Sequence, residues 1–257
     1  MKKIDLAVVL IIPLFVFISV FLLGFKINYF QSLLLFFGIP SLYLSLKSKE
    51  KIRKVAPFSF LVSIPIAIIF ELVAFGDKAW TVPYSILHWR LLGIIPLEDY
   101  MWMFLVTYTI LIFYEHFCNN SFQKQMNGKV KTMVIILYSL TIILIALFFF
   151  APYLLSIPYS YLWAGIALFV IPTALFLSKY PLFFKPFLKV SLFFFYIHML
   201  FELVGLKLQH WTFTGKHFIA LISIAGFKFP AEELVFVMIF GGFACCAYYV
   251  FFTDKKL

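Results

Sequence analysis

The chain has few charged residues for its length of 257, because Asp, Glu, Lys and Arg together make up only 12% of it. A soluble globular domain carries about a quarter charged residues. Hydrophobic residues reach 64% here, and apolar runs long enough to cross a bilayer recur along the sequence. These features exclude an ordinary soluble domain and indicate a membrane protein with several helical spans.

Cysteines and glycine-rich motifs are also scarce. Cys118, Cys245 and Cys246 have no metal-binding or redox spacing, and the last two are adjacent within an apolar run. No glycine-rich phosphate-binding fingerprint follows a strand-like segment. The sequence therefore predicts no metal site and no cofactor such as a tightly bound flavin or nucleotide.

The net charge of +10 does not indicate nucleic-acid binding, because the lysines lie in short loops between apolar runs. With a cytoplasmic N-terminus, fifteen Lys and Arg residues fall on the cytoplasmic side and six on the other. The positive-inside rule then predicts cytoplasmic N- and C-termini. The basic loops are expected to contact water or anionic membrane lipid.

The apolar runs predict an all-α membrane bundle of about eight transmembrane helices. The first run is too long for a signal peptide and is expected to be a retained span. Four spans fall in each half, so residues 1–125 and 126–257 are expected to form two membrane repeats. An even number of spans per repeat makes the repeats parallel. The expected spans are a first one ending near 25, then 27–46 with a kink at Pro40, 57–75, 96–117, 132–151, 156–177, 186–206 and 230–252.

A seven-residue motif occurs twice, at 96–102 and at 230–236. Each copy reads Pro, any residue, two acidic residues, two apolar residues and an aromatic. Upstream, Phe-Glu-Leu-Val occurs at 70–73 and again at 201–204, and in both copies a tryptophan follows the glutamate by nine residues (Trp80 and Trp211). The repeated order indicates an internal duplication with an offset of about 131 residues.

Six of the eleven acidic residues belong to these motifs. A carboxylate within or at the end of an apolar span is costly and is by default a functional candidate. Clustered acids in different environments can supply one protonated donor and one ionised acceptor. The candidate catalytic residues are therefore Glu98, Asp99, Glu232, Glu233, Glu71 and Glu202.

Each acidic pair follows a proline that suits the first turn of a helix, near the positive end of the helix dipole. The first acid and the aromatic are four residues apart and share a face, whereas the second acid points about 100° away. One acid of each pair is thus expected to face the bundle interior and the other a neighbouring helix or the interface.

Aromatic residues make up 21% of the chain, and their faces stabilise cations without offering an oxygen nucleophile. Acid, base and aromatic walls suit carbocation chemistry on an isoprenoid hydrocarbon dissolved in the membrane. The expected substrate-binding aromatics are Trp80, Trp211, Trp102 and Phe236.

These elements resemble the small membrane-embedded lycopene cyclase domains that occur as paired subunits in some bacteria and as fused domains in archaea and fungi. The matching elements are the span-ending Glu71 and Glu202, the tryptophan after each, and the Pro-x-acid-acid opening of the last span. The resemblance covers residues 28–117 and 156–252, one domain per half. Domains of that family have three spans, which makes the first and fifth spans additions. At Asp99 the family pattern has glutamate.

The resemblance implies a redox-neutral cyclisation of lycopene or a related linear carotenoid. An acid protonates a terminal double bond, the cation closes a six-membered ring, and a base removes a proton. Catalytic or essential roles are implied for Glu98 with Asp99 and for Glu232 with Glu233, and less strongly for Glu71 and Glu202. The expected setting is the inner membrane of a prokaryote, with other carotenoid-pathway enzymes as partners.

Other functions fit part of the pattern. A carotenoid hydratase would use the same acid and capture the cation with water. A proton-coupled transporter would use the carboxylates as proton carriers, although such sites tend to lie at broken helices near the midplane. An intramembrane protease would need an arginine where Phe236 or Met103 stands. A purely structural subunit would leave the repeated acids unexplained.

Structural roles also compete for single residues. The acidic pairs can cap helices at the membrane interface, and Trp80 and Trp211 can belong to an interfacial aromatic belt. His198 lies one turn before Glu202 on the same helix face, which predicts a hydrogen bond between the two. His88, His210 and His217 are expected in the polar loops beside the motifs.

Overall fold

The fold was analysed on a computed structural model, which describes residues 2–87, 89–119 and 129–254. It is an all-α helical bundle, as the sequence predicts, with helical segments close to the eight expected spans. Seven of the described segments are long and apolar enough to cross a membrane, so the fold is that of an integral membrane protein. The expected repeat boundary at 125/126 and His88 lie outside the described residues.

The first half contains four helical segments in chain order. They are α1 (Lys2–Phe21); a composite span of α2 (Tyr29–Leu33), the π-helix η1 (Leu34–Gly38) and α3 (Ile39–Lys47); α4 (Lys49–Asp77); and α5 (Leu97–Phe117). α5 has 21 residues, carries both acids of the first motif in its first turn, and is not one of the seven segments counted above.

The second half follows the same order. Its segments are α6 (Lys129–Phe150), followed by the short η2 (Pro152–Leu155); a composite of α7 (Ser160–Gly165), the π-helix η3 (Ile166–Val170) and α8 (Ile171–Lys179); α9 (Phe184–Leu208), preceded by η4 (Pro181–Phe183); and η5 (Glu233–Phe240) continued by α10 (Gly241–Thr253).

Each composite span contains one π-helical turn at an Ile-Pro pair. Pro40 and Pro172 lack a backbone N–H, and the isoleucine before each donates five residues back, to Leu34 and Ile166 respectively. The wider turn lets the helix continue through the proline. The expected kink at Pro40 is therefore a π-turn that both halves share.

The basic cluster after the second span was expected to be a loop, and this prediction is wrong. Only Ser48 separates α3 from α4, and α4 begins at Lys49. Lys51 and Lys54 turn inward and lie 3.1 Å and 3.8 Å from the buried Glu115 of α5. Paired charges allow these lysines to lie within the bundle, which lengthens the helix by two turns.

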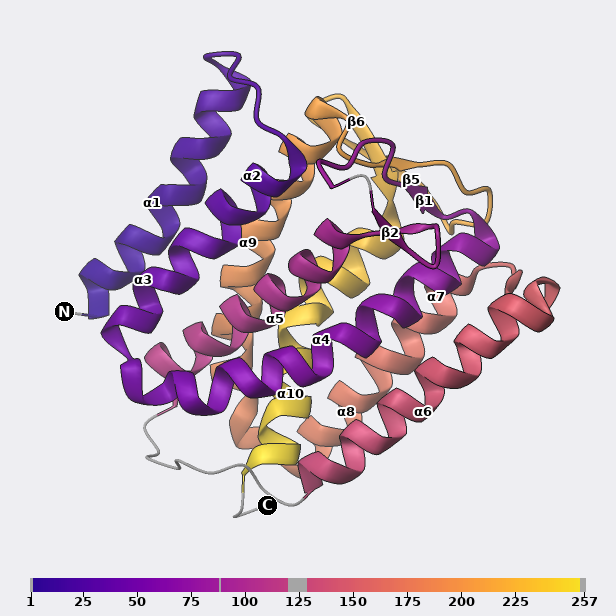
Figure 1. Cartoon of the computed structure of the whole chain (residues 1–257). Coiled ribbons are helices and arrows are strands. Elements are labelled where there is room, and N and C mark those ends of the chain that lie inside the picture. Colours follow the sequence, from indigo (N-terminus) through magenta and orange to yellow (C-terminus); the bar gives the residue numbers. More distant parts are fainter. Residues whose placement is uncertain (1, 88, 120–128, 255–257) are drawn as a thin grey trace.

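The polar connections form small β-structures at one end of the bundle, away from the C-terminus (Figure 1). Three antiparallel pairs occur among the described residues: β1 (Trp80–Thr81) with β4 (Thr212–Phe213), β2 (Arg90–Leu91) with β3 (Ile95–Pro96), and β5 (Leu221–Ile224) with β6 (Phe227–Pro230). Thr81 pairs with Thr212, its counterpart 131 residues later, and their hydroxyl oxygens are 3.0 Å apart. An antiparallel pair between counterparts is what a two-fold axis between the halves requires.

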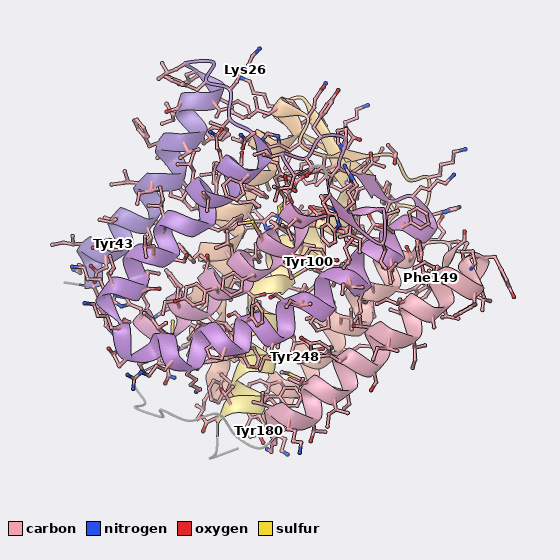
Figure 2. All side chains as sticks on the ribbon, in the orientation of Figure 1. Lys26, Tyr43, Tyr100, Phe149, Tyr180 and Tyr248 are labelled. Atoms are coloured by element: carbon pink, nitrogen blue, oxygen red, sulfur yellow. The ribbon has the colours of Figure 1, made fainter. Side chains whose placement is uncertain are left out.

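The helices differ in how much of their surface is buried. α4 packs against α5, and α9 packs against α10. α6 lies at the edge, where Phe149 is 62% exposed, whereas Tyr248 of α10 lies between helices (Figure 2). From Leu140 to Phe150 the exposed side chains of α6 are apolar, as expected for a helix that faces lipid.

Candidate functional site

An elongated cavity of about 380 Å³ lies inside the bundle. Carboxyl groups from both halves border it: Glu71 and Asp99 from the first, Glu202 and Glu233 from the second. The rest of the wall is mostly aliphatic and aromatic, and it includes Trp80, Trp102, Phe194, Phe201 and Trp211. Of the described residues that line the cavity, none is lysine or arginine. The two sequence motifs thus meet in one apolar space.

The second acid of each pair faces the cavity and accepts a hydrogen bond from a tyrosine. Tyr29 donates to Asp99, with 2.9 Å between the oxygens, and Tyr161 donates to Glu233. Both tyrosines stand eleven residues before the proline of the π-turn, in the composite span of their half. The two halves therefore hold their cavity-facing acids in the same way.

The span-ending glutamates are held by the tryptophans that follow them. The indole Nε1 of Trp80 donates to Glu71 at 3.1 Å, and that of Trp211 donates to Glu202 at 2.9 Å. These bonds explain the repeated spacing of nine residues. Because the indoles also line the cavity, Trp80 and Trp211 are more than members of an interfacial belt.

Aromatic contacts cross between the halves. The ring of Tyr29 packs edge-on against Trp211 with 5.4 Å between centroids, and Tyr161 packs against Trp80 at the same distance. Each tyrosine therefore binds the acid of its own half and contacts the tryptophan of the other. Neither half completes its own carboxyl site alone.

The first acid of each pair lies outside the cavity wall. Glu98 accepts bonds from the Ile86 N–H at 2.8 Å and the Ser85 hydroxyl at 2.7 Å. Glu232 accepts from the Ile219 N–H at 2.6 Å. Both are buried, and both tie the connecting loop to the start of the last span. Their geometry is that of loop anchors, and the catalytic roles expected from the sequence for Glu98 and Glu232 stay predictions.

The aromatic residues of the motifs also separate. Trp102 lines the cavity, but Phe236 is not among its lining residues and packs close to Gly165 of α7. From the sequence, each of these aromatic residues was expected on the same helix face as the first acid of its motif. In the second half, the π-helix η5 begins at Glu233 and changes the angular spacing between residues, so the two motifs do not superpose turn for turn.

His198 contacts a different acid from the one expected. Its Nε2 lies 3.2 Å from Oε1 of Glu233, and its side chain is almost fully buried. His198, Glu202 and Glu233 each place a ligand atom within 4.8 Å of the others, so this group could hold a metal ion. Trp211 and Tyr161 already donate to the two glutamates, which orients them toward the histidine.

The carboxyl groups of each half interact electrostatically, Glu71 with Asp99 and Glu202 with Glu233. Like charges placed close together in an apolar surrounding raise the free energy of the state in which both carboxyl groups are ionised. Paired carboxyl groups in such a setting are the usual proton donors and acceptors of acid–base catalysis.

His210 lies beside the site, in the loop after α9. Its Nε2 is 3.0 Å from the Ser32 hydroxyl, and its ring stacks on Tyr29 with 5.8 Å between centroids. The side chain is buried, and this burial lowers the pKa of His210 to about 4. A neutral imidazole therefore supports the tyrosine that donates to Asp99.

Comparison with protein-family models, with characterised proteins and with solved structures finds no match for the chain.

The loop-anchor role of the first acids can be measured by amide hydrogen exchange. We expect Glu98→Ala and Glu232→Ala to accelerate exchange near Ile86 and Ile219, because the backbone N–H of each loop residue loses its side-chain acceptor. A hydrogen bond of this kind contributes about 0.5–1.5 kcal/mol, or roughly two- to ten-fold in exchange. The controls Asp99→Asn and Glu233→Gln should leave these loops unchanged. If the loop amides were equally protected from exchange in all four variants, Glu98 and Glu232 would not be loop anchors.

The buried His210 makes stability depend on pH. In the unfolded chain its pKa is about 6.5, and in the folded chain it is about 4. The unfolded state then binds the proton more readily, so stability is complete above about pH 6.5 and falls as the pH drops towards 4. We expect His210→Gln, which keeps a partner for Ser32, to flatten the fall in unfolding temperature between pH 7 and pH 5. An unchanged slope would contradict the assignment.

Proposed function

We propose that the chain is a carotenoid cyclase, which closes the end groups of lycopene or a related linear carotenoid by acid catalysis, without a redox change. The observation that carries the proposal is the meeting of two carboxyl pairs, one from each half, in a single apolar cavity. Buried acids in a membrane bundle mark functional sites by default. Here both pairs have fixed donors and face the same space.

The shape of the cavity suits a long hydrocarbon. Along α4 its wall extends from Glu71 back to Phe58, thirteen residues, or about 20 Å at 1.5 Å per residue. The carboxyl groups lie at one end of this length, and the remaining wall is mostly apolar. A linear polyene would place its end group among the acids and its chain along the helices.

The cavity supplies each requirement of the reaction. A carboxylic acid gives a proton to the terminal double bond, and the positive charge forms on the neighbouring carbon. A second double bond attacks that carbon and closes the ring, and a carboxylate then takes a proton from a carbon beside the new cation. Aromatic faces at Trp80, Trp102, Phe201 and Trp211 stabilise the passing charge. One proton enters and one leaves, so no cofactor is needed.

The same groups support hydration as the second candidate, since water could capture the cation. A second cavity of about 350 Å³, whose lining includes Glu71, Thr81 and Arg90, is large enough to hold that water. Proton-coupled transport is a weaker candidate, because the acids are clustered at one end of the cavity rather than at a broken helix near its middle.

We place the chain in the inner membrane of a prokaryote, where its substrate is dissolved and other enzymes of the carotenoid pathway would act beside it. The uneven Lys and Arg count favours cytoplasmic termini and puts the acids in the outer half of the bilayer.

This orientation is tested with a fluorescent protein fused to the C-terminus and a periplasmic phosphatase inserted after Gly215. We expect a fluorescent fusion and an active phosphatase, because both reporters depend on the compartment in which they fold. A dark fusion with an inactive phosphatase would reverse the orientation.

Cyclisation is tested by expressing the chain in bacteria that accumulate lycopene and separating the extracted pigments. We expect monocyclic or bicyclic carotenes, and a loss of about 100-fold or more when Asp99→Asn and Glu233→Gln are combined. Glu50→Gln, an exposed carboxylate on α4, serves as the matched control and should retain activity. Hydroxylated acyclic pigments would establish the hydratase instead, and unchanged lycopene with the protein present in the membrane would reject both.

A further inference from the structure

The two halves repeat each other's tyrosine and tryptophan bonds, but their carboxyl pairs differ in access to water. Glu202 is 2% exposed, whereas Glu71 is partly exposed. The second, polar cavity borders Glu71, Trp80 and Val82, all of which also line the large cavity. Glu71 therefore stands between an inner space and an outer one.

The outer cavity reaches the surface of the bundle. Thr81 and Gly93, which line it, are exposed. Arg90 also lines it and is fixed by two backbone carbonyls, that of Ile94 at 3.1 Å and that of Val82 at 2.8 Å. Its positive charge acts on Glu71 and Asp99. A polar cavity with a fixed charge and an exposed rim is a route by which water can reach the first pair.

The second half carries a histidine where the first has alanine. His198 and Ala67 are 131 residues apart and correspond in the duplication. The imidazole lies 3.2 Å from Glu233, and its Nδ1 has no partner among the described residues. An imidazole with Nδ1 unbonded can carry its proton on Nε2 and donate it to Glu233. With Tyr161 also donating, Glu233 has a donor on each of its two carboxyl oxygens, which fixes its position in the cavity.

We propose that the two halves carry out different proton transfers of one reaction. This proposal rests on the cyclase function proposed above. The Glu71–Asp99 pair is the acid and is reprotonated by water through the Arg90 cavity. Glu233, held by His198 and Tyr161, is the base. His198 is a positioning residue, because it acts through Glu233.

With the acid in the first half and the base in the second, every proton and every bond of the cyclisation is accounted for. Asp99 or Glu71 loses a proton to the terminal double bond of the carotenoid, one carbon–carbon bond forms, and Glu233 gains the proton released as the ring double bond forms. After the product leaves, that proton passes across the shared cavity to the first pair and from there to water, and the first pair then takes its next proton from water by the same route. The first pair thus delivers a solvent-derived proton in each turnover.

The test compares matched variants of the two halves in lycopene-accumulating bacteria. We expect Glu71→Gln and Asp99→Asn to leave linear lycopene, with conversion reduced about 100-fold. Glu233→Gln and His198→Ala should still consume lycopene, but should give a changed ratio of ring double-bond isomers or a hydroxylated end group. His198→Gln retains a donor to Glu233 and should restore the wild-type ratio. A merely structural role would lower the yield without moving this ratio.

The result that would overturn the division is the reverse pattern, or an equal loss in both halves with the isomer ratio unchanged. Wild-type protein that produces no rings would reject the cyclase function itself, so the two failures are distinguishable. Treatment of membranes with EDTA tests for a metal ion. If EDTA abolished activity and Zn²⁺ restored it, the assignment of Glu233 as the base would be wrong, and His198, Glu202 and Glu233 would be assigned to a metal centre.

The route for water is tested separately at Arg90. When isolated membranes are given unlabelled lycopene in deuterated buffer, the wild-type product should gain one solvent-derived deuterium per ring. We expect Arg90→Met, which makes the outer cavity apolar, to slow conversion about tenfold without altering the isomer ratio. Lys228→Met removes an exposed positive charge from the corresponding loop of the second half and should have no effect. Equal rates in both variants would overturn the entry route.

Discussion

The structure depends on the cost of placing carboxyl groups in an apolar interior, since a buried polar group without a partner destabilises a fold. Each of the six motif acids has a donor fixed by the chain. Tyrosines hold Asp99 and Glu233, tryptophans hold Glu71 and Glu202, and loop donors hold Glu98 and Glu232. The spans, the loops and the cavity are arranged so that these bonds form.

Much of this arrangement could be predicted from the sequence where the signal is local. The apolar runs predict the spans, and the nine-residue spacing of each Glu and Trp connects the end of one span to the loop that follows. Both partners lie close together in the chain, so their repetition indicates a contact. The helix period also separates the two acids of each pair correctly, but it does not say which one faces inward.

The rest depends on contacts between distant segments. Tyr29 is 70 residues from Asp99, and Tyr161 is 72 from Glu233. The common distance of each tyrosine to its Ile-Pro pair was a usable signal, since it repeats in both halves. The partner of His198 had no such signal, because the helix face favours Glu202 while the packing of η5 against α9 brings Glu233 nearer. The inward lysines of α4 were missed because Glu115 lies on another helix.

The crossed tyrosine and tryptophan contacts have an evolutionary consequence. In a dimer of identical subunits, both tyrosine–tryptophan contacts would be made by the same two residues, because a two-fold axis repeats each interface residue. Any substitution in such a dimer changes both sites together. Joining the copies in one chain removes that restriction, so one gene can hold alanine at position 67 and histidine at 198. Fusion allows the two halves of a symmetric scaffold to differ at corresponding positions.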